Sequence, residues 1–177
     1  MPSDAMGEVA FRPVIRDDYA LLEVWLNSPH MREWWGDSDD ELGFIRDMVE
    51  GRDTTRPYLI TLDARPVGYI QCWYVGPHQT EEWTTDNPWI SELPNDAVGV
   101  DLSIGEPDLL SRGIGTAALE RFVAMLRAEG HETIIIDPDP ANSRAVRAYT
   151  KAGFRPVPEL QGRFDDVLVM QFDPNRK

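Results

Sequence analysis

The centre of the chain reads Ala97-Val98-Gly99-Val100-Asp101-Leu102-Ser103-Ile104, and it continues through Leu110-Ser111-Arg112-Gly113-Ile114-Gly115-Thr116 into the segment 117–126. The first segment alternates apolar residues with small or polar ones, which predicts a β-strand. In the last segment, the apolar residues fall on one helical stripe, formed by Leu119, Phe122, Val123 and Leu126. The stretch therefore predicts a strand, a glycine-rich turn and a helix, in that order.

The glycine-rich turn has the features of an anion site. Gly113 and Gly115 carry no Cβ, so their backbone N–H groups can approach a ligand closely. Both lie where the helix is expected to begin, and the unpaired N–H groups and dipole of a helix N-terminus favour an anion. The turn is predicted to hold a phosphate or pyrophosphate. A tight turn without a ligand is the alternative.

The same residues also match a dinucleotide fingerprint, because 113–118 reads G-x-G-x-x-A and Asp137 follows roughly 20 residues later. Three observations argue against it. Residues 105–109 separate the glycines from their strand, the motif lies past the middle of the chain, and too little chain follows to complete a doubly wound sheet. A Walker turn is excluded because no lysine follows the glycines. The pyrophosphate of an acyl-CoA remains.

Length and composition indicate one domain, because domains commonly contain about 100–200 residues. We expect a disordered start over 1–8, a domain over 9–173 and a tail over 174–177. The chain contains no apolar run of membrane-spanning length and no signal-peptide pattern. A single cysteine, Cys72, excludes an internal disulfide and a cysteine-based metal cluster, and no metal is expected. The sequence predicts a cytoplasmic protein without a membrane partner.

The formal net charge of −14 argues against a nucleic-acid partner, which requires basic patches. A negative cleft would attract a cationic small molecule. Solubility alone would also account for the charge.

The first half of the chain alternates helical and extended patterns. Residues 9–15 predict an edge strand because of Pro13. Asp17 or Asp18 is expected to cap a helix with a stripe at 21, 22, 25 and 26, and a short helix follows from Pro29. Ser38 is expected to cap a third helix, with its inward side chains at Phe44, Ile45, Met48 and Val49. Residues 58–62 and 67–74 predict an antiparallel pair of strands.

Residues 76–96 predict a long loop that contains acidic and tryptophan residues, among them Glu81, Trp83, Asp86 and Trp89. Such loops are often functional. We expect either a solvated surface loop or a lid over a cationic, ring-shaped ligand.

The second half predicts a buried, parallel strand over 132–136, because that run is rich in β-branched residues. Asn142 or Ser143 is expected to cap a helix over 144–152, and closing strands follow over 154–158 and 166–172. The order of elements is that of a mixed α+β domain.

A second motif occupies 137–154, Asp-Pro-Asp-Pro-Ala-Asn-Ser-Arg-Ala-Val-Arg-Ala-Tyr-Thr-Lys-Ala-Gly-Phe. Its pattern N-x-x-A-x-x-x-Y-x-K-x-G-F, together with the glycine turn, resembles the GNAT N-acetyltransferases. The turn departs from their signature at Leu110, where the family has Gln or Arg. Further segments resemble the aminoglycoside 6′-N-acetyltransferases: Trp25-Leu26-Asn27, Glu33-Trp34-Trp35-Gly36, Val67-Gly68-Tyr69 with Gln71, Gly99-Val100-Asp101 and Asp137-Pro138.

This resemblance implies a GNAT fold, with a twisted, mostly antiparallel sheet, a parallel crossover at its centre and flanking helices. It implies transfer of acetyl from acetyl-CoA (coenzyme A) to the 6′-amino group of aminoglycosides by a monomer or homodimer. The catalytic residues would be Asp101 as base and Tyr149 as acid. The coenzyme would contact Leu102, Ile104, Ser111, Arg112, Gly113, Ile114, Gly115, Thr116, Asn142, Ala145 and Tyr149. The aminoglycoside would contact Trp34, Trp35, Tyr69, Gln71, Asp86, Asp101, Asp137 and Asp165.

Acetyl transfer to an amine places demands on these side chains. An ordinary Asp, with a pKa of about 3.9, is a poor base toward an amine with a pKa of about 10. Either burial and neighbouring acids raise the pKa of Asp101, or its carboxylate only positions the amine. Tyr149 is protonated at neutral pH and can donate to the leaving thiolate. Backbone amides between Gly99 and Leu102 would stabilise the thioester oxygen if the strand bulges there.

Two other functions remain compatible with the sequence. One is acylation of a hydroxylysine-like siderophore precursor or of another metabolite amine. The other is a non-catalytic module that binds acyl-CoA.

Overall fold

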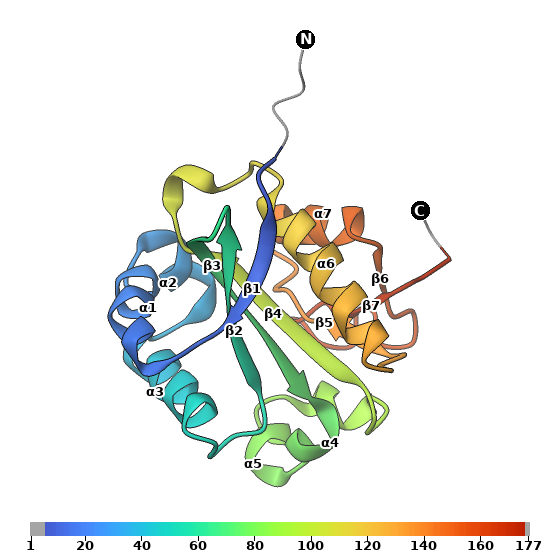
Figure 1. The fold of residues 1–177 in the computed structure, drawn as a ribbon. Helices are drawn as coiled ribbons and strands as arrows, with labels where there is room; N and C mark the ends of the chain where they lie inside the picture. Colours follow the sequence, from blue (N-terminus) through green and yellow to red (C-terminus); the bar gives the residue numbers. More distant parts are fainter. Residues whose placement is uncertain (1–5, 176–177) are drawn as a thin grey trace.

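The computed structural model describes residues 6–175, and it contains a seven-stranded sheet in the order β1-β2-β3-β4-β5-β7-β6 (Figure 1). All neighbouring strands are antiparallel except β4 and β5. The strands are β1 (Val9–Pro13), β2 (Arg56–Leu62), β3 (Arg65–Tyr74), β4 (Val98–Ile104), β5 (Ile134–Ile136), β6 (Phe154–Pro156) and β7 (Met170–Phe172). The predicted mixed α+β class with a central parallel crossover is confirmed. Residues 1–5 of the expected disordered start and residues 176–177 of the tail lie outside the described residues.

The first three strands form a meander at one side of the sheet. β1 is the edge strand, as Pro13 indicated, although it ends at Pro13 and not at Ile15. The turn between β2 and β3 places Asp63 and Ala64 at φ 49° and 67°, as a tight hairpin requires. β2 and β3 both exceed the predicted segments.

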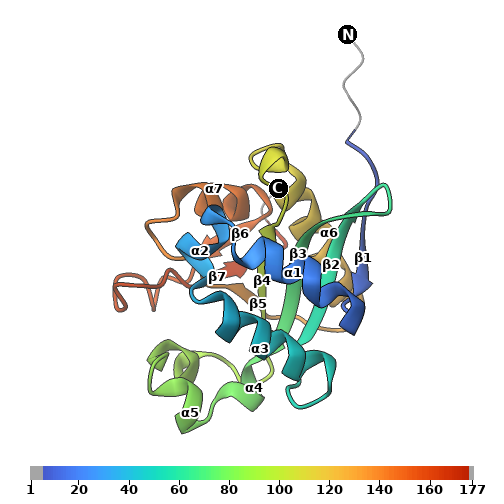
Figure 2. The same cartoon turned by 90° about the vertical axis from the view of Figure 1, so that its left-hand side faces the viewer.

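Three helices near the N-terminus cover one face of the sheet (Figures 1 and 2). They are α1 (Tyr19–Leu26), α2 (Pro29–Trp35) and α3 (Ser38–Val49), and a short 3-10 helix η1 (Arg16–Asp18) precedes them. Their buried side chains include Leu22, Trp25 and Ile45, which pack with Leu59 and Tyr69 of the sheet. The alternation of strand side chains sends Leu59 and Tyr69 to this face, and sends Ile60 and Ile70 to the other.

Two predictions in this region are wrong, and a third is right in position only. The N-cap of α3 is Asp37, whose Oδ1 accepts from the N–H groups of Asp39 and Asp40, because Ser38 is already helical. Asp18 is the N-cap residue of α1, as predicted, but its carboxylate makes no cap hydrogen bond and pairs with the Arg12 guanidinium at 2.8 Å. Phe44 does not point into the core: it is 43% exposed, and Leu42 takes the inward position.

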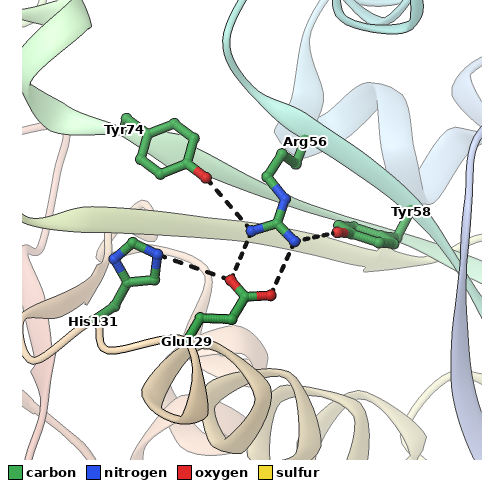
Figure 3. Close-up of polar contacts among 5 residues, drawn as sticks. All are labelled: Arg56, Tyr58, Tyr74, Glu129 and His131. Carbon is green, nitrogen blue, oxygen red and sulfur yellow. Dashed lines mark hydrogen bonds and ion pairs between the residues drawn. The ribbon is translucent and has the colours of Figure 1, made fainter.

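The opposite face carries α6 (Ile114–Ala128), whose predicted stripe of Leu119, Phe122, Val123 and Leu126 is buried against the sheet. A polar cluster joins the end of α6 to β2 and β3 (Figure 3). Both oxygens of Glu129 accept from Arg56, at 2.7 and 3.1 Å, and Arg56 also donates to the hydroxyls of Tyr58 and Tyr74. The Nε2 atom of His131 lies 3.9 Å from Glu129.

The predicted loop over 76–96 is largely helical. It contains α4 (Val75–His78), α5 (Glu81–Thr84) and the 3-10 helix η2 (Pro88–Glu92), which lie at one end of β3 and β4 (Figure 1). Trp89, Ile90 and Leu93 are buried in a cluster with Trp73, so packing orders a segment whose composition resembles that of a loop.

The strand β4 leads through the 3-10 helix η3 (Pro107–Leu109) to α6, as the central stretch predicted. After β5, helix α7 (Ser143–Lys151) begins at its cap Asn142, whose Oδ1 accepts from the N–H of Ala145 at 3.2 Å. The closing strands β6 and β7 are shorter than predicted. Among the described residues, no helix combines the length and hydrophobicity that a membrane crossing requires.

Candidate active site

A pocket of about 630 Å³ opens on the face of the sheet that α1 to α3 cover. Its walls come from α2, α3, β3, β4, the segment 78–90, the glycine turn and α7. The lining includes residues of the glycine turn and a group of acidic and aromatic side chains. The pocket therefore joins two chemically different surfaces in one cavity.

The glycine turn presents the N-terminus of α6 to the pocket. Gly113 is the N-cap of α6 at φ 81°, and Ser111 also has a positive φ of 59°. No side chain within residues 6–175 caps the helix, so the first N–H groups of α6 are left for another acceptor. A Cβ on Gly115 would approach no atom of the described residues closer than Ile104 Cγ1, at 4.0 Å, so its absence leaves open space. This is the arrangement of a helix N-terminus that binds an anion.

The sheet opens beside this turn. β4 pairs with β5 only at Val98 and Gly99, and beyond Gly99 the two strands no longer pair. The predicted bulge in β4 is wrong, because the register with β3 is continuous from Gly68–Ile104 to Tyr74–Val98. The separation of β4 from β5, and not a bulge, exposes the β4 backbone near Asp101.

Two carboxyl groups lie at the floor of the pocket. Asp101 is on β4 and Asp137 follows β5, so the parallel pair brings together residues 36 positions apart. Burial raises the pKa of Asp101, and burial together with the charge of Asp101 raises the pKa of Asp137 well above its usual value. Burial and the short distance between the two groups thus oppose the simultaneous ionisation of Asp101 and Asp137, and Asp137 is the one whose ionisation the pair disfavours more.

The carboxyl pair is held by a chain of hydrogen bonds from β3. The Tyr69 hydroxyl donates to Gln71 Oε1 at 2.7 Å, and Gln71 Nε2 donates to Asp101 Oδ2 at 2.9 Å. The Oδ1 atom of Asp137, in contrast, is buried and accepts no hydrogen bond from the described residues. Buried acceptors are costly when unpaired, so this oxygen is suited to a ligand donor.

Tyr149, on α7, also lines the pocket. Burial and the charges of Asp101 and Asp137 raise the pKa of its phenol well above the usual value. The hydroxyl therefore keeps its proton at neutral pH and can act as a donor.

Aromatic side chains form a further part of the pocket wall. They come from three separate segments: Trp34 and Trp35 from α2, Phe44 from α3, and Trp73, Trp83 and Trp89 from the β3–β4 region. Trp73 meets Trp89 edge to face at 6.1 Å between centroids, and Phe44 faces Trp83 at 6.0 Å. Part of the segment 76–96 therefore lines the pocket, as the lid hypothesis expected.

The pocket contains most of the predicted site residues: Trp34, Trp35, Gln71, Asp101, Leu102, Ile104, Ser111, Gly113, Gly115, Thr116, Asp137, Asn142, Ala145 and Tyr149. Five predicted residues do not line it. Tyr69 is 1% exposed and reaches the site only through Gln71. Ile114 packs into the core, and the exposed side chains of Arg112, Asp86 and Asp165 lie outside the pocket walls.

Several residues of the pocket are not among those predicted from the sequence. Glu41 lines it from α3, His78 and Asp53 line it together with their side chains 3.7 Å apart, and Arg144 and Arg147 line it from α7. No motif marks these residues in the sequence, where each resembles an ordinary surface polar residue. An acid in the first turn of a helix, such as Glu41, is usually explained by the helix dipole alone.

Comparison with known proteins agrees with this geometry. Residues 14–162 match the acetyltransferase (GNAT) domain family. The chain is 32% identical over 160 residues to the aminoglycoside N(6′)-acetyltransferase type 1 of Klebsiella pneumoniae, a match that covers 86% of this chain and 76% of the relative. The corresponding Serratia marcescens protein matches equally.

The fold is also similar to that of solved acetyltransferases. The structure of AAC(6′)-Ib in complex with paromomycin and acetyl-CoA superposes with a TM-score of 0.76 at 28% identity, over 94% of each chain. The complex of AAC(6′)-Ib with coenzyme A and kanamycin gives the same TM-score at 27% identity, over 94% of this chain and 95% of that one. The protein therefore belongs to the GNAT acetyltransferase family and is similar to its aminoglycoside N(6′)-acetyltransferases.

Proposed function

We propose that the protein transfers the acetyl group of acetyl-CoA to the 6′-amino group of aminoglycoside antibiotics, and so confers resistance to them. The observation that carries the proposal is the single pocket that joins an uncapped helix N-terminus to a carboxyl pair and an aromatic wall. A coenzyme diphosphate fits the first surface, and a ring-shaped polyamine fits the second.

The residues around the glycine turn suit acetyl-CoA. The N–H groups at the start of α6 would hold its diphosphate, and Asn142 and Ala145 line the same pocket from α7. The opening between β4 and β5 leaves β4 backbone groups free to hydrogen-bond the pantetheine arm. When bound, acetyl-CoA supplies an acetyl thioester.

The acidic end suits an aminoglycoside, which carries several ammonium groups on linked rings. Asp137 Oδ1 is a buried acceptor that has no donor among the described residues, and Asp101 lies close to it. Aromatic faces such as those of Trp34 and Trp35 can pack against sugar rings and attract cations. Relatives of this chain have been solved with kanamycin and with ribostamycin.

The proton movements follow from the raised pKa values. The attacking amine must lose a proton, and the raised pKa of Asp101 makes its carboxylate a better acceptor than an ordinary aspartate. The departing thiolate must gain a proton, and the Tyr149 hydroxyl can supply it because its phenol is protonated. Asp101 and Tyr149 are thus the proposed catalytic base and acid.

The remaining parts of the proposal concern the setting of the enzyme. Acetyl-CoA is a cytoplasmic metabolite, so the proposed enzyme is cytoplasmic. All residues that line the pocket come from one chain, so the proposed enzyme can act as a monomer or as a homodimer. The domain spans 9–173.

The test is release of free thiol from acetyl-CoA with kanamycin and tobramycin, with mass spectrometry of the products. Paromomycin, which has a hydroxyl in place of the 6′-amine, serves as a matched substrate control. We expect monoacetylated kanamycin and tobramycin, little reaction with paromomycin, and at least a hundredfold lower kcat for Asp101→Asn, the scale of a lost acid–base group. Turnover of N6-hydroxylysine with the antibiotics ignored would overturn the substrate class, and coenzyme binding without turnover of any amine would indicate a binding module.

A further inference from the structure

Glu41 is a carboxylate of the pocket that neither the proposed base nor the proposed acid requires. It lies in the first turn of α3, together with Asp39 and Asp40. Those two side chains are exposed, whereas that of Glu41 is half-buried and lines the pocket. No group within residues 6–175 hydrogen-bonds or ion-pairs with its carboxylate.

The position of Glu41 is unfavourable in the free protein. The helix dipole favours an acid in this turn, but Asp39 and Asp40 meet that need at the surface. Burial and the charge of Asp101 disfavour the ionised form of Glu41, and its pKa rises to about 7. A buried, unpaired acid is compensated when a ligand places a cation beside it.

A second acceptor in the same pocket is also without a partner. The Oδ1 atom of Asp137 is buried and unpaired, and Asp137 lies at the end of β5, on a different wall from α3. The two acceptors can therefore meet different donors of one molecule. A ligand with a single ammonium group leaves one of them unsatisfied.

We propose that Glu41 binds an ammonium group of the substrate other than the one that is acetylated, and that this contact selects polyamines over monoamines. The proposal rests on the proposed function and adds to it a residue that determines specificity. Glu41 does not touch the transferred acetyl group in this assignment, so its effect belongs to substrate binding and not to the chemical step.

The contact depends on pH because Glu41 must be ionised to bind an ammonium group. The titratable groups near it are Asp40 on its own helix, Asp101 on β4 and Tyr69 on β3, and the same pocket also holds Asp53, His78, Asp137 and Tyr149. As the pH falls through about 7, Glu41 gains a proton and the contact is lost. The KM for a polyamine should therefore rise as the pH falls through about 7, and this rise should be smaller when residue 41 cannot ionise.

The experiment compares Glu41→Gln with Asp40→Asn, which removes a charge from the same helical turn at an exposed position. Each enzyme is assayed between pH 6 and 8.5 with kanamycin and with 6-amino-6-deoxyglucose, a monoamine that keeps the reactive group. For E41Q we expect a KM for kanamycin about tenfold higher or more, the scale of a lost charge-assisted hydrogen bond. We expect an unchanged kcat at saturation, a KM for kanamycin that rises less as the pH falls than in the parent enzyme, and an unchanged kcat/KM for the monoamine.

The following results would overturn the proposal or limit Glu41 to a structural role. An unchanged KM in E41Q, or an equal loss in D40N, overturns the proposal. An equal loss of kcat/KM with both substrates also overturns it, because Glu41 would then act on the reacting amine. If the monoamine is not turned over, calorimetry provides the test: the affinity for kanamycin should fall in E41Q and not in D40N, and an unchanged affinity in E41Q overturns the proposal. Glu41→Asp, which keeps the charge, should recover part of the affinity, and a purely structural role would give no such recovery.

Failure of the proposed function has a different signature. In that case the parent enzyme neither acetylates nor binds kanamycin, whereas failure of this inference leaves the parent active. Thermal unfolding and coenzyme binding, measured for each variant, verify that the fold is retained.

Discussion

Gln71 and Asp101 face each other directly across β3 and β4, and Gln71 Nε2 donates to Asp101 Oδ2 at 2.9 Å. The hydrogen bond favours the ionised form of Asp101, and so opposes the effect of burial on its pKa. The amide of Gln71 is itself oriented by the Tyr69 hydroxyl. A core tyrosine thus influences the proton affinity of a pocket carboxylate.

Replacement of Gln71 by Leu should raise the pKa of Asp101 further, because the ionised carboxylate loses a donor. A higher pKa means less ionised base at a given pH, so the rising limb of kcat/KM should move to higher pH. The measurement is the pH profile of kcat/KM with kanamycin. Tyr69→Phe should cause a smaller shift in the same direction, and Gln161→Ala, at an exposed position, should cause none. A shift toward lower pH would contradict the role assigned to Gln71.

Replacement of Tyr149 by Phe should lower kcat by about a hundredfold, the lower range of effects for a lost general acid. In the parent enzyme, the raised pKa of the phenol should keep Tyr149 protonated throughout the assayable range, so this residue should cause no alkaline loss of activity below about pH 10. Stopped-flow or steady-state thiol release measures both effects. A phenol that titrates near pH 8 by ultraviolet absorbance would be inconsistent with this environment.

Replacement of Gly113 by Ala should destabilise the turn by about 1–2 kcal/mol, because φ is 81° and a side chain is strained there. We expect a raised KM for acetyl-CoA, since the turn orients the first N–H groups of α6. Gly43→Ala is the matched control. Gly43 lies inside α3, and a Cβ there would approach no described atom within 4 Å, so it should stabilise the protein by about 0.5–1 kcal/mol. Equal behaviour of the two variants would refute the argument from backbone conformation.

Replacement of Glu129 by Gln should weaken the attachment of α6 to β2 and β3 (Figure 3). The Arg56 guanidinium lowers the pKa of Glu129, so the ion pair contributes fully above the ordinary value of 4.5 and is lost as the pH falls through the lower value of the folded protein. Both side chains are about one-third exposed, and we expect a loss of about 0.5–1 kcal/mol at pH 7. Urea unfolding at pH 7 and pH 3 tests this: parent and variant should differ at pH 7 and converge at pH 3. A difference that persists at pH 3 would point to packing.

The residues that lie close together in the chain were predictable from local patterns. The order of strand, glycine turn and helix over 97–126 follows from hydrophobic periodicity and from glycines at a helix start, and the structure contains all three. The Asn142 cap and the following helix were equally readable. The conformation of these segments depends on residues that are neighbours in the chain, so a local sequence pattern is enough to predict it.

Local patterns failed where long-range packing decides. Phe44 fits a helical stripe but faces Trp83, and the segment 76–96 resembles a loop but folds as short helices, because Trp89 and Ile90 are buried against Trp73. The local pattern of 76–96 does not reveal that Trp73 packs against Trp89 and Ile90 and so makes their burial favourable.

From the sequence alone, the fold family could be predicted, together with a candidate anion site at the glycine turn and the candidate residues Asp101, Asp137 and Tyr149. Which acids share the pocket depends on how the chain packs: Glu41 lies in the pocket, Asp86 and Asp165 lie outside its walls, and Asp101 and Asp137 lie close enough to affect each other's pKa. The physical reason is that a carboxyl pKa depends on burial and on charges within a few ångströms. Those distances are set when α3, β4 and β5 pack together.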